Sequence, residues 1–442
     1  MKIYKKLLYI SLFGLIFLRF SISYLIITSF PKMENVFNLN NFQLGTIISV
    51  YFLMSVIFLF IWIYLFGKYS KFKIFLLSSF LWVLGSILFS FSQNYVHLLI
   101  FSAIIGCSIE ASAIFVLLML FQISPNQKQG KVLALFMIIQ GAGGIFGVFL
   151  TATFEDLLGF SWNFVFLFIG IISLIWVIMS GVLFLKTEKF NILIEPYFEK
   201  GGYILNFKLF RESLQRKTNL NLIIIIFYST PFIFFLNLWI QKYFHDYHSL
   251  TQMEAAISYI FLSGGEFLGI IFGGFLFDKY YSRDNYNKIF IIIFGIFLSI
   301  PLLFIGFLIF WKKPFESSGV GLIDIALNLF HYTFTNPLIF VSYIMLFIGF
   351  VCFGLIYPFF LILINDCNND NEKGTILGIK NLIEIMGQAL SPIIGGLIAD
   401  NFSILIVMLF VPLFLIIPLI HLILMRKVIE ADFFSINKDL AE

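Results

Sequence analysis

The chain consists of long apolar runs separated by short polar segments. A helix needs about 20 residues to cross a hydrocarbon core, and twelve runs are long enough. Each must be helical, because an open strand would leave its backbone groups unpaired in lipid. The predicted spans are residues 7–30, 42–66, 74–92, 96–121, 130–152, 162–185, 219–241, 252–277, 287–311, 336–364, 375–399 and 402–426. The pattern therefore predicts an all-α integral membrane protein with twelve transmembrane helices.

A short phrase occurs twice, once in each half of the chain. The second apolar run ends in LFGKY (65–69), and the eighth ends in LFDKY (276–280). Such a repeat indicates a duplicated helical bundle, which is the architecture of many secondary transporters. The predicted organisation is a six-helix bundle (1–185), a linker (186–218), a second six-helix bundle (219–426) and a tail (427–442).

The composition agrees with a membrane protein and excludes several classes of function. The chain is 60% hydrophobic and 12% charged, whereas about a quarter of the residues in soluble domains are charged. The three cysteines are odd in number, and the five histidines lie scattered without metal-ligand spacing. No glycine-rich phosphate loop with its lysine is present. We therefore expect no enzyme activity, metal, cofactor or nucleic-acid partner.

The basic residues are distributed unevenly between the loops. Of 28 Lys and Arg residues, 22 lie at the two termini or in alternate segments, namely 67–73, 122–131, 186–218, 278–288 and 365–374. The remaining loops hold four, which are Lys32, Lys242, Lys312 and Lys313. Because basic loops stay on the cytoplasmic side, this bias predicts a cytoplasmic-membrane protein with both termini and the linker inside the cell.

Several phrases, taken with the six-plus-six division, resemble the major facilitator superfamily and, within it, the Spinster-like group. YLFGKYSKF (64–72) is similar to the group's Y-L-G-D-R-Y-S-R-K, and EAS (110–112) matches its E-A-S in helix 4. GQALSP (387–392) with Asp400 beyond it is similar to G-D-A-x-S-P…D in helix 11. Trp239 matches the first residue of a W-x-P-x-(Y/F) phrase, although Gln241 replaces the proline. The resemblance implies the major facilitator fold of two six-helix halves.

The chain also departs from the group. The group has an Asp-Arg pair in helix 1 whose aspartate is thought to carry a coupling proton, but Ile22 and Ser23 occupy those positions and only the following Tyr24 agrees. The family's loop motif implies a conformational latch at four residues: Gly67 and Lys68 in the first copy, Asp278 and Lys279 in the second. Gly67 replaces the motif aspartate, so we expect closure to depend on Asp278.

Charged residues inside the spans are the first candidates for substrate or proton handling. A charge at mid-membrane costs about 3 kcal/mol on insertion scales and normally faces a cavity or a partner. The candidate acids are Glu110, Glu266 and Glu384, and the candidate cations are Arg19 and Lys380. Each acid has the alternative of being a hydrogen-bonded structural group.

Two pairings of these charges are open. Arg19 could bind an anionic head group or neutralise Glu110, since helices 1 and 4 both line the cavity in the superfamily. Lys380 could snorkel to the inner surface or pair with Glu384 at i, i+4. Gln388 extends that polar face by one turn, and the resemblance adds Tyr24 and Trp239 to the candidates.

Glycines in helices 5 and 8 form small-xxx-small stripes, at Gly143 and Gly147 and at Gly265, Gly269 and Gly273. Such stripes let helix backbones approach closely in lipid. Since these helices face each other across the superfamily's domain interface, we expect a packing seam between the halves; the alternative is tight packing inside one half.

The expected function is secondary active transport by alternating access. The resemblance implies an amphiphilic substrate such as a lysophospholipid, with a proton or cation as a candidate coupling ion, and we expect a functional monomer among membrane lipids. A transporter of the same fold for a small organic solute, metabolite or drug is the first alternative. A non-transporting membrane sensor or scaffold is the alternative from another class.

Overall fold

The computed structural model describes residues 2–124, 129–189, 215–280, 285–309, 311–312, 321–355, 368 and 370–425. These residues fall into two compact units, Met1–Tyr203 and Ile204–Glu442, whose boundary lies inside the predicted linker. Within the described residues, twelve helices are long and apolar enough to cross a membrane, six in each unit. The predicted number of spans and the all-α class are therefore confirmed.

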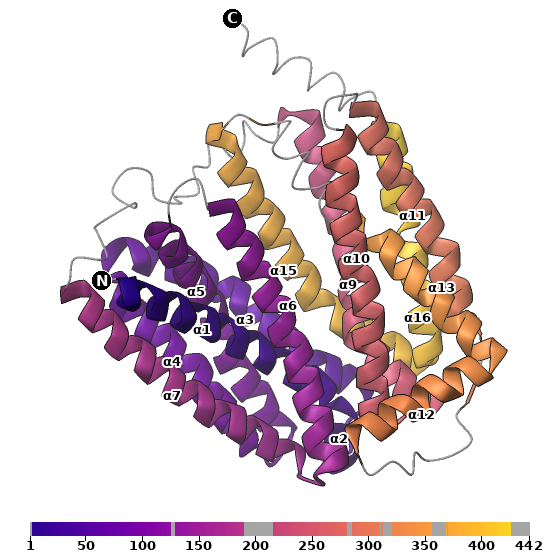
Figure 1. The fold of residues 1–442 in the computed structure, drawn as a ribbon, viewed down its shortest axis with the longest axis horizontal. Coiled ribbons are helices and arrows are strands. Elements are labelled where there is room, and N and C mark those ends of the chain that lie inside the picture. Colours follow the sequence, from indigo (N-terminus) through magenta and orange to yellow (C-terminus); the bar gives the residue numbers. More distant parts are fainter. Residues whose placement is uncertain are drawn as a thin grey trace, which may run out of the picture. The chain divides into compact units, whose positions relative to one another are not determined.

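The helices of the first unit are α1 (Lys2–Thr28), α2 (Phe30–Phe37), α3 (Asn41–Lys68), α4 (Lys71–Ser90), α5 (Tyr95–Ile123), α6 (Gln129–Ala152) with a π-helical turn (Thr153–Leu157), and α7 (Trp162–Lys189). Those of the second unit are α9 (Lys217–His248), α10 (Gln252–Tyr280), α11 (Asn285–Leu308), α12 (Leu322–Thr335), α13 (Pro337–Gly354), α15 (Asp370–Asn401) and α16 (Ile404–Phe414). Figure 1 labels them.

The two units repeat one packing pattern. In the first, α1 packs against α6 and α7, α3 against α5, and α4 against α5 and α7. In the second, α9 packs against α15 and α16, α10 against α13, and α11 against α13 and α16. In each unit the first span thus contacts the fifth and sixth, and the second contacts the fourth. The repeated loop phrase therefore reflects a duplication of the whole bundle.

The second span of each unit also begins in the same way. At α3, Asn40 accepts a hydrogen bond from the Gln43 backbone N–H (2.8 Å), and the Gln43 side chain accepts one from Asn40 N–H (3.0 Å). At α10, Thr251 and Glu254 exchange the equivalent bonds (3.3 and 3.0 Å). Each is a capping box, which satisfies backbone donors that a helix start leaves unpaired. These boxes fix where the two spans begin.

Helix α9 runs seven residues further than the predicted end of its span at residue 241. Lys242, which the charge analysis placed in a loop, is buried in the helix and lies 2.6 Å from Asp246. Two residues after Asp246, His248 contacts the Trp311 carbonyl (2.5 Å) and the Tyr243 hydroxyl (2.9 Å). These polar contacts allow α9 to continue, which corrects the assignment of Lys242.

The long segment between spans 9 and 10 contains an unpredicted helix, α12, which lies across the ends of α10 and α13 (Figure 1).

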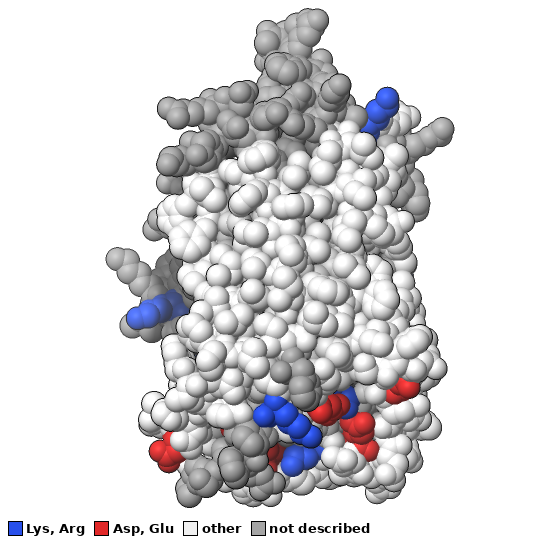
Figure 2. Space-filling model, turned by 90° about the vertical axis from the view of Figure 1, so that its right-hand side faces the viewer, with Lys and Arg blue, Asp and Glu red and all other residues white. Residues whose placement is uncertain are grey.

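On the face that Figure 2 draws, most charged side chains gather near one end of the molecule, beside a wide surface without Lys, Arg, Asp or Glu. Large apolar side chains of the transmembrane helices are also exposed, such as Phe275 of α10 (70% exposed) and Phe297 of α11 (64%). Such uncovered apolar surface fits lipid rather than water.

Candidate functional site

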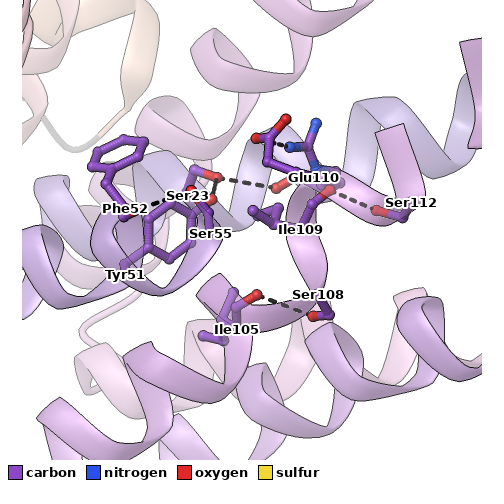
Figure 3. A network of polar contacts seen from close by, with 10 residues as sticks. Ser23, Tyr51, Phe52, Ser55, Ile105, Ser108, Ile109, Glu110 and Ser112 are labelled. Atoms are coloured by element: carbon purple, nitrogen blue, oxygen red, sulfur yellow. Dashed lines mark hydrogen bonds and ion pairs between the residues drawn. The ribbon is translucent and has the colours of Figure 1, made fainter. Parts of the chain in front are cut away.

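An ion pair joins α1 to α5 inside the first unit. Arg19 Nη2 lies 2.9 Å from Glu110 Oε1, and a dashed line at the labelled Glu110 marks this contact in Figure 3. The Arg19 side chain is 5% exposed and the Glu110 side chain 28%. Both side chains lie within spans, where an unpaired charge is costly, and the ion pair leaves neither charge without a counter-ion. Of the two sequence interpretations of Arg19, the structure shows the one in which it pairs with Glu110.

A tyrosine–serine contact brings α3 to the same place. The Ser23 hydroxyl lies 2.5 Å from the Tyr51 hydroxyl and also donates to the Arg19 carbonyl (3.4 Å), and Figure 3 shows this network beside Glu110. Ser112, which belongs to the matched tripeptide, instead donates to Ile109 of its own helix (2.9 Å). The site therefore consists of one ion pair and two linked hydroxyls on three helices.

One N–H donor of Arg19 has no partner among the described residues. Its Nε is buried without a hydrogen-bond partner among the described residues, and its guanidinium carbon lies 4.7 Å from the Phe20 ring centre. A guanidinium has five N–H donors in a fixed plane, and the Glu110 contact uses one of them. The Nε–H of Arg19 is therefore a donor without a described partner beside the ion pair with Glu110.

Helix α15 of the second unit carries the other predicted pair. Lys380 Nζ lies 2.5 Å from Glu384 Oε1, with side-chain exposures of 14% and 28%. The i, i+4 pairing is thus confirmed. Gln388 is half-buried one turn further along the helix, so the three residues form a polar stripe on α15.

Glu266 is the third acid inside the spans. It is half-buried in α10, and it has no hydrogen bond or ion pair with any residue that the structure describes. Its backbone carbonyl lies against Gly354 of α13. Glu266 therefore differs from Glu110 and Glu384, each of which has a cation beside it.

Two aromatic candidates have packing contacts. Trp239 is 0% exposed, and its indole lies against Gly395, where α9 crosses α15. Its ring thus packs against a helix of its own unit, and the role of Trp239 in substrate contact stays a prediction. Tyr24 is half-buried, with its ring over Gly144 of α6.

The glycine stripes pack inside each unit. Gly143 and Gly147 of α6 lie against the Phe17 and Ser21 carbonyls of α1. Gly265 and Gly269 of α10 lie against the Phe347 and Val351 carbonyls of α13, and Gly273 is buried further along α10. These contacts correct the expected seam between halves, because each stripe faces a helix of its own bundle.

The latch residues are only partly described. Lys68 is exposed at the end of α3, with its amine 5.8 Å from the Tyr64 ring centre. The side chains of Asp278 and Lys279, and the surroundings of Gly67, lie outside the described residues.

A buried pair of asparagines is a further contact that the sequence did not predict. The Asn219 and Asn368 side chains donate hydrogen bonds to each other (2.7 and 2.8 Å) and are both buried. This amide pair ties the start of α9 to the segment before α15. The residues lie 149 positions apart, so no local spacing could have revealed the pair. The one available signal was an asparagine in the first turn of an apolar span.

Comparison with solved structures agrees with this fold. The chain is similar to a bacterial homolog of the human lysosomal transporter Spinster, in its inward-facing and unoccupied conformation (TM-score 0.74, 14% identity, 98% of this chain and 99% of that one). It is also similar to a structure of such a homolog described as inward-facing and occupied (TM-score 0.70, 14% identity, 97% and 98%). At this identity the likeness shows the shared fold.

Comparison by sequence gives the family. No curated protein matches the chain. The sequence profile of the Major Facilitator Superfamily, however, matches residues 12–383. This match begins in α1 and ends in α15, so it spans both units. The chain therefore belongs to the Major Facilitator Superfamily.

Proposed function

We propose that the chain is a secondary active transporter that works by alternating access. The observation that carries this proposal is the Arg19–Glu110 ion pair inside the spans of the first unit. Burying two charges in the membrane is costly even when they are paired, and apolar residues could fill the same space. A sensor or scaffold has little use for such a pair, whereas a transporter needs polar groups where its substrate crosses.

The proposed substrate is an amphiphilic organic molecule such as a lysophospholipid. The resemblance of the loop, helix-4 and helix-11 motifs to the Spinster-like group supports this class. The Arg19 Nε, which has no described partner, suits the anionic part of such a molecule. A small organic solute or drug is the second candidate, because the same ion pair could bind it.

Flux across a membrane tests the proposal. The purified chain in proteoliposomes is expected to move at least one member of a panel of lysophospholipids, small metabolites and drugs faster than protein-free liposomes. The ratio of lysophospholipid flux to metabolite flux then separates the two substrate classes. Absence of flux across the whole panel, with the protein folded and inserted in both orientations, would favour the sensor or scaffold.

We further propose that both termini and the linker lie in the cytoplasm, as the distribution of Lys and Arg indicates. The two ends of α7 provide a matched test, because Ser161 and Lys186 are both exposed. In a background without native cysteines, Ser161→Cys is expected to react with an impermeant thiol reagent on intact cells. Lys186→Cys should react only after permeabilisation, and strong labelling of Lys186→Cys on intact cells would reverse the topology. Glu155, although near the same loop, is 5% exposed and would be a poor probe.

A further inference from the structure

Two of the three glutamates inside the spans have a cation beside them, and the third has none among the described residues. Glu110 has Arg19 at 2.9 Å. Glu384 has Lys380 at 2.5 Å. Glu266 has neither a cation nor a hydrogen-bond donor among the described residues. It lies 14 residues after the start and 10 before the end of the span Gln252–Leu276, so its side chain is too short to reach either membrane surface.

The helices packed against α10 bring no counter-ion to this level. These helices are α9, α11, α12 and α13. The titratable side chains of α13 are Tyr343 and Cys352. The Tyr343 hydroxyl lies 2.5 Å from the Ser258 hydroxyl, and Ser258 is two turns from Glu266 along α10. The described side chains of α11, from residue 290 onward, include none.

Helices α9 and α12 carry their titratable groups away from the level of Glu266, apart from Tyr228 of α9, which is exposed. The other groups of α9 lie at Lys217 and in the segment 242–248. Those of α12 are Asp324, His331 and Tyr332, at the end of the bundle where α10 begins. On α10 itself, Tyr259 is two turns from Glu266 and Glu254 three turns, and Asp278 and Lys279 are more than three turns away in the other direction.

A polar atom without a partner lies beside Glu266 on the same helix flank. Ser263 Oγ, one turn earlier, is buried and has no hydrogen-bond partner among the described residues. Serine hydroxyls within helices usually donate to a carbonyl of the preceding turn, as Ser258 does to Glu254 (2.8 Å). Positions i and i+3 share a helix face, so Ser263 offers Glu266 a hydroxyl that no other described group uses.

We propose that Glu266 is the group that binds the coupling cation, and that this cation is a proton. The inference rests on the proposed function, since coupling has meaning only in a transporter. A carboxylate without a counter-ion in the membrane is stabilised by taking up a proton, because a neutral acid is far easier to bury. A sodium ion would need about six oxygen ligands, by analogy with other hard cations, and the flank offers the Glu266 carboxyl and the Ser263 hydroxyl. Helix 1, where the related group has its aspartate, carries Ile22 and Ser23 instead.

Infrared spectroscopy of the full chain in lipid tests the site without any substrate. Above about pH 6, exposed carboxyls with their usual pKa of about 4 are ionised, so the carbonyl stretch of one remaining protonated carboxyl group is expected there and should vanish as the pH rises further. Glu266→Gln should remove this band, whereas Glu110→Gln and Glu384→Gln should leave it in place. A band that survives in Glu266→Gln would overturn the proposal. A band that disappears on adding sodium at constant pH would also overturn it, in favour of a sodium site.

Transport then provides a second, separate readout. Once a substrate is known, the at least tenfold change in wild-type uptake expected between acidic and alkaline pH should fall below twofold in Glu266→Gln. If Glu266→Gln fails to fold, Glu266→Asp keeps the acid and should shift the midpoint of the pH profile. Without flux, the proposed function fails while the infrared result still decides the proton site. Unchanged pH dependence in a folded Glu266→Gln protein would refute its role in coupling.

Discussion

Glu110→Gln is expected to destabilise the protein more than the double variant Arg19→Gln/Glu110→Gln does. The single change leaves Arg19, which is 4% exposed, as a buried cation without its counter-ion. Removing one partner of a buried pair costs about 3 kcal/mol, and the 28% exposure of Glu110 favours a value at or below this. Removing both charges leaves no unpaired ion, so the double variant should recover most of the loss. Thermal unfolding in detergent, combined with membrane abundance, measures this difference.

The same cycle separates a structural role of the pair from a functional one. If the pair handles substrate, the double variant should be abundant in the membrane and yet transport at less than about a tenth of the wild-type rate, which corresponds to about 1.4 kcal/mol in the barrier. Ser112→Ala is the matched control, because Ser112 follows Glu110 by two positions and bonds only within its own helix among the described residues. Equal destabilisation by the single and double variants would show that the two charges do not act as a unit.

Hydrophobicity alone was enough to predict the spans, because the thickness of the membrane sets the length that every helix must reach. The exception at α9 has a local cause, since the Lys242–Asp246 pair and the buried His248 allow polar residues to remain inside the helix. The i, i+4 spacing of Lys242 and Asp246 could have indicated that α9 continues past residue 241. The segment that forms α12 reads as a loop, because its apolar stretch is too short to span.

Pairings within one helix could be predicted, and pairings between helices only with help from the family. Lys380 and Glu384 share a face by spacing alone. That Arg19 meets Glu110 required knowing that helices 1 and 4 are neighbours in the superfamily. The motif match at Trp239 did not reveal that its indole packs into the α9–α15 crossing. Spacing shows that a glycine stripe exists, but the fold decides which helix it faces.

The close crossing of α10 and α13 predicts the other large effect. A Cβ atom built on Gly269 would collide with the Val351 carbonyl and lie 2.9 Å from Gly354 Cα. Both neighbours are backbone atoms, so no side-chain rotation can relieve the contact. The helices would have to separate, and we expect Gly269→Ala to cost about 3 kcal/mol, at the upper end for overpacked sites.

Gly264→Ala on the same helix is the matched control. A Cβ atom at Gly264 has nothing within 4 Å, and alanine is favoured over glycine in a helix by about 1 kcal/mol. Gly264→Ala should therefore be neutral or slightly stabilising, although the chemical change is identical. Thermal unfolding of both variants in the same detergent measures the difference. If they unfold at the same temperature, α10 and α13 do not approach at Gly269, and the glycine stripe must serve another contact.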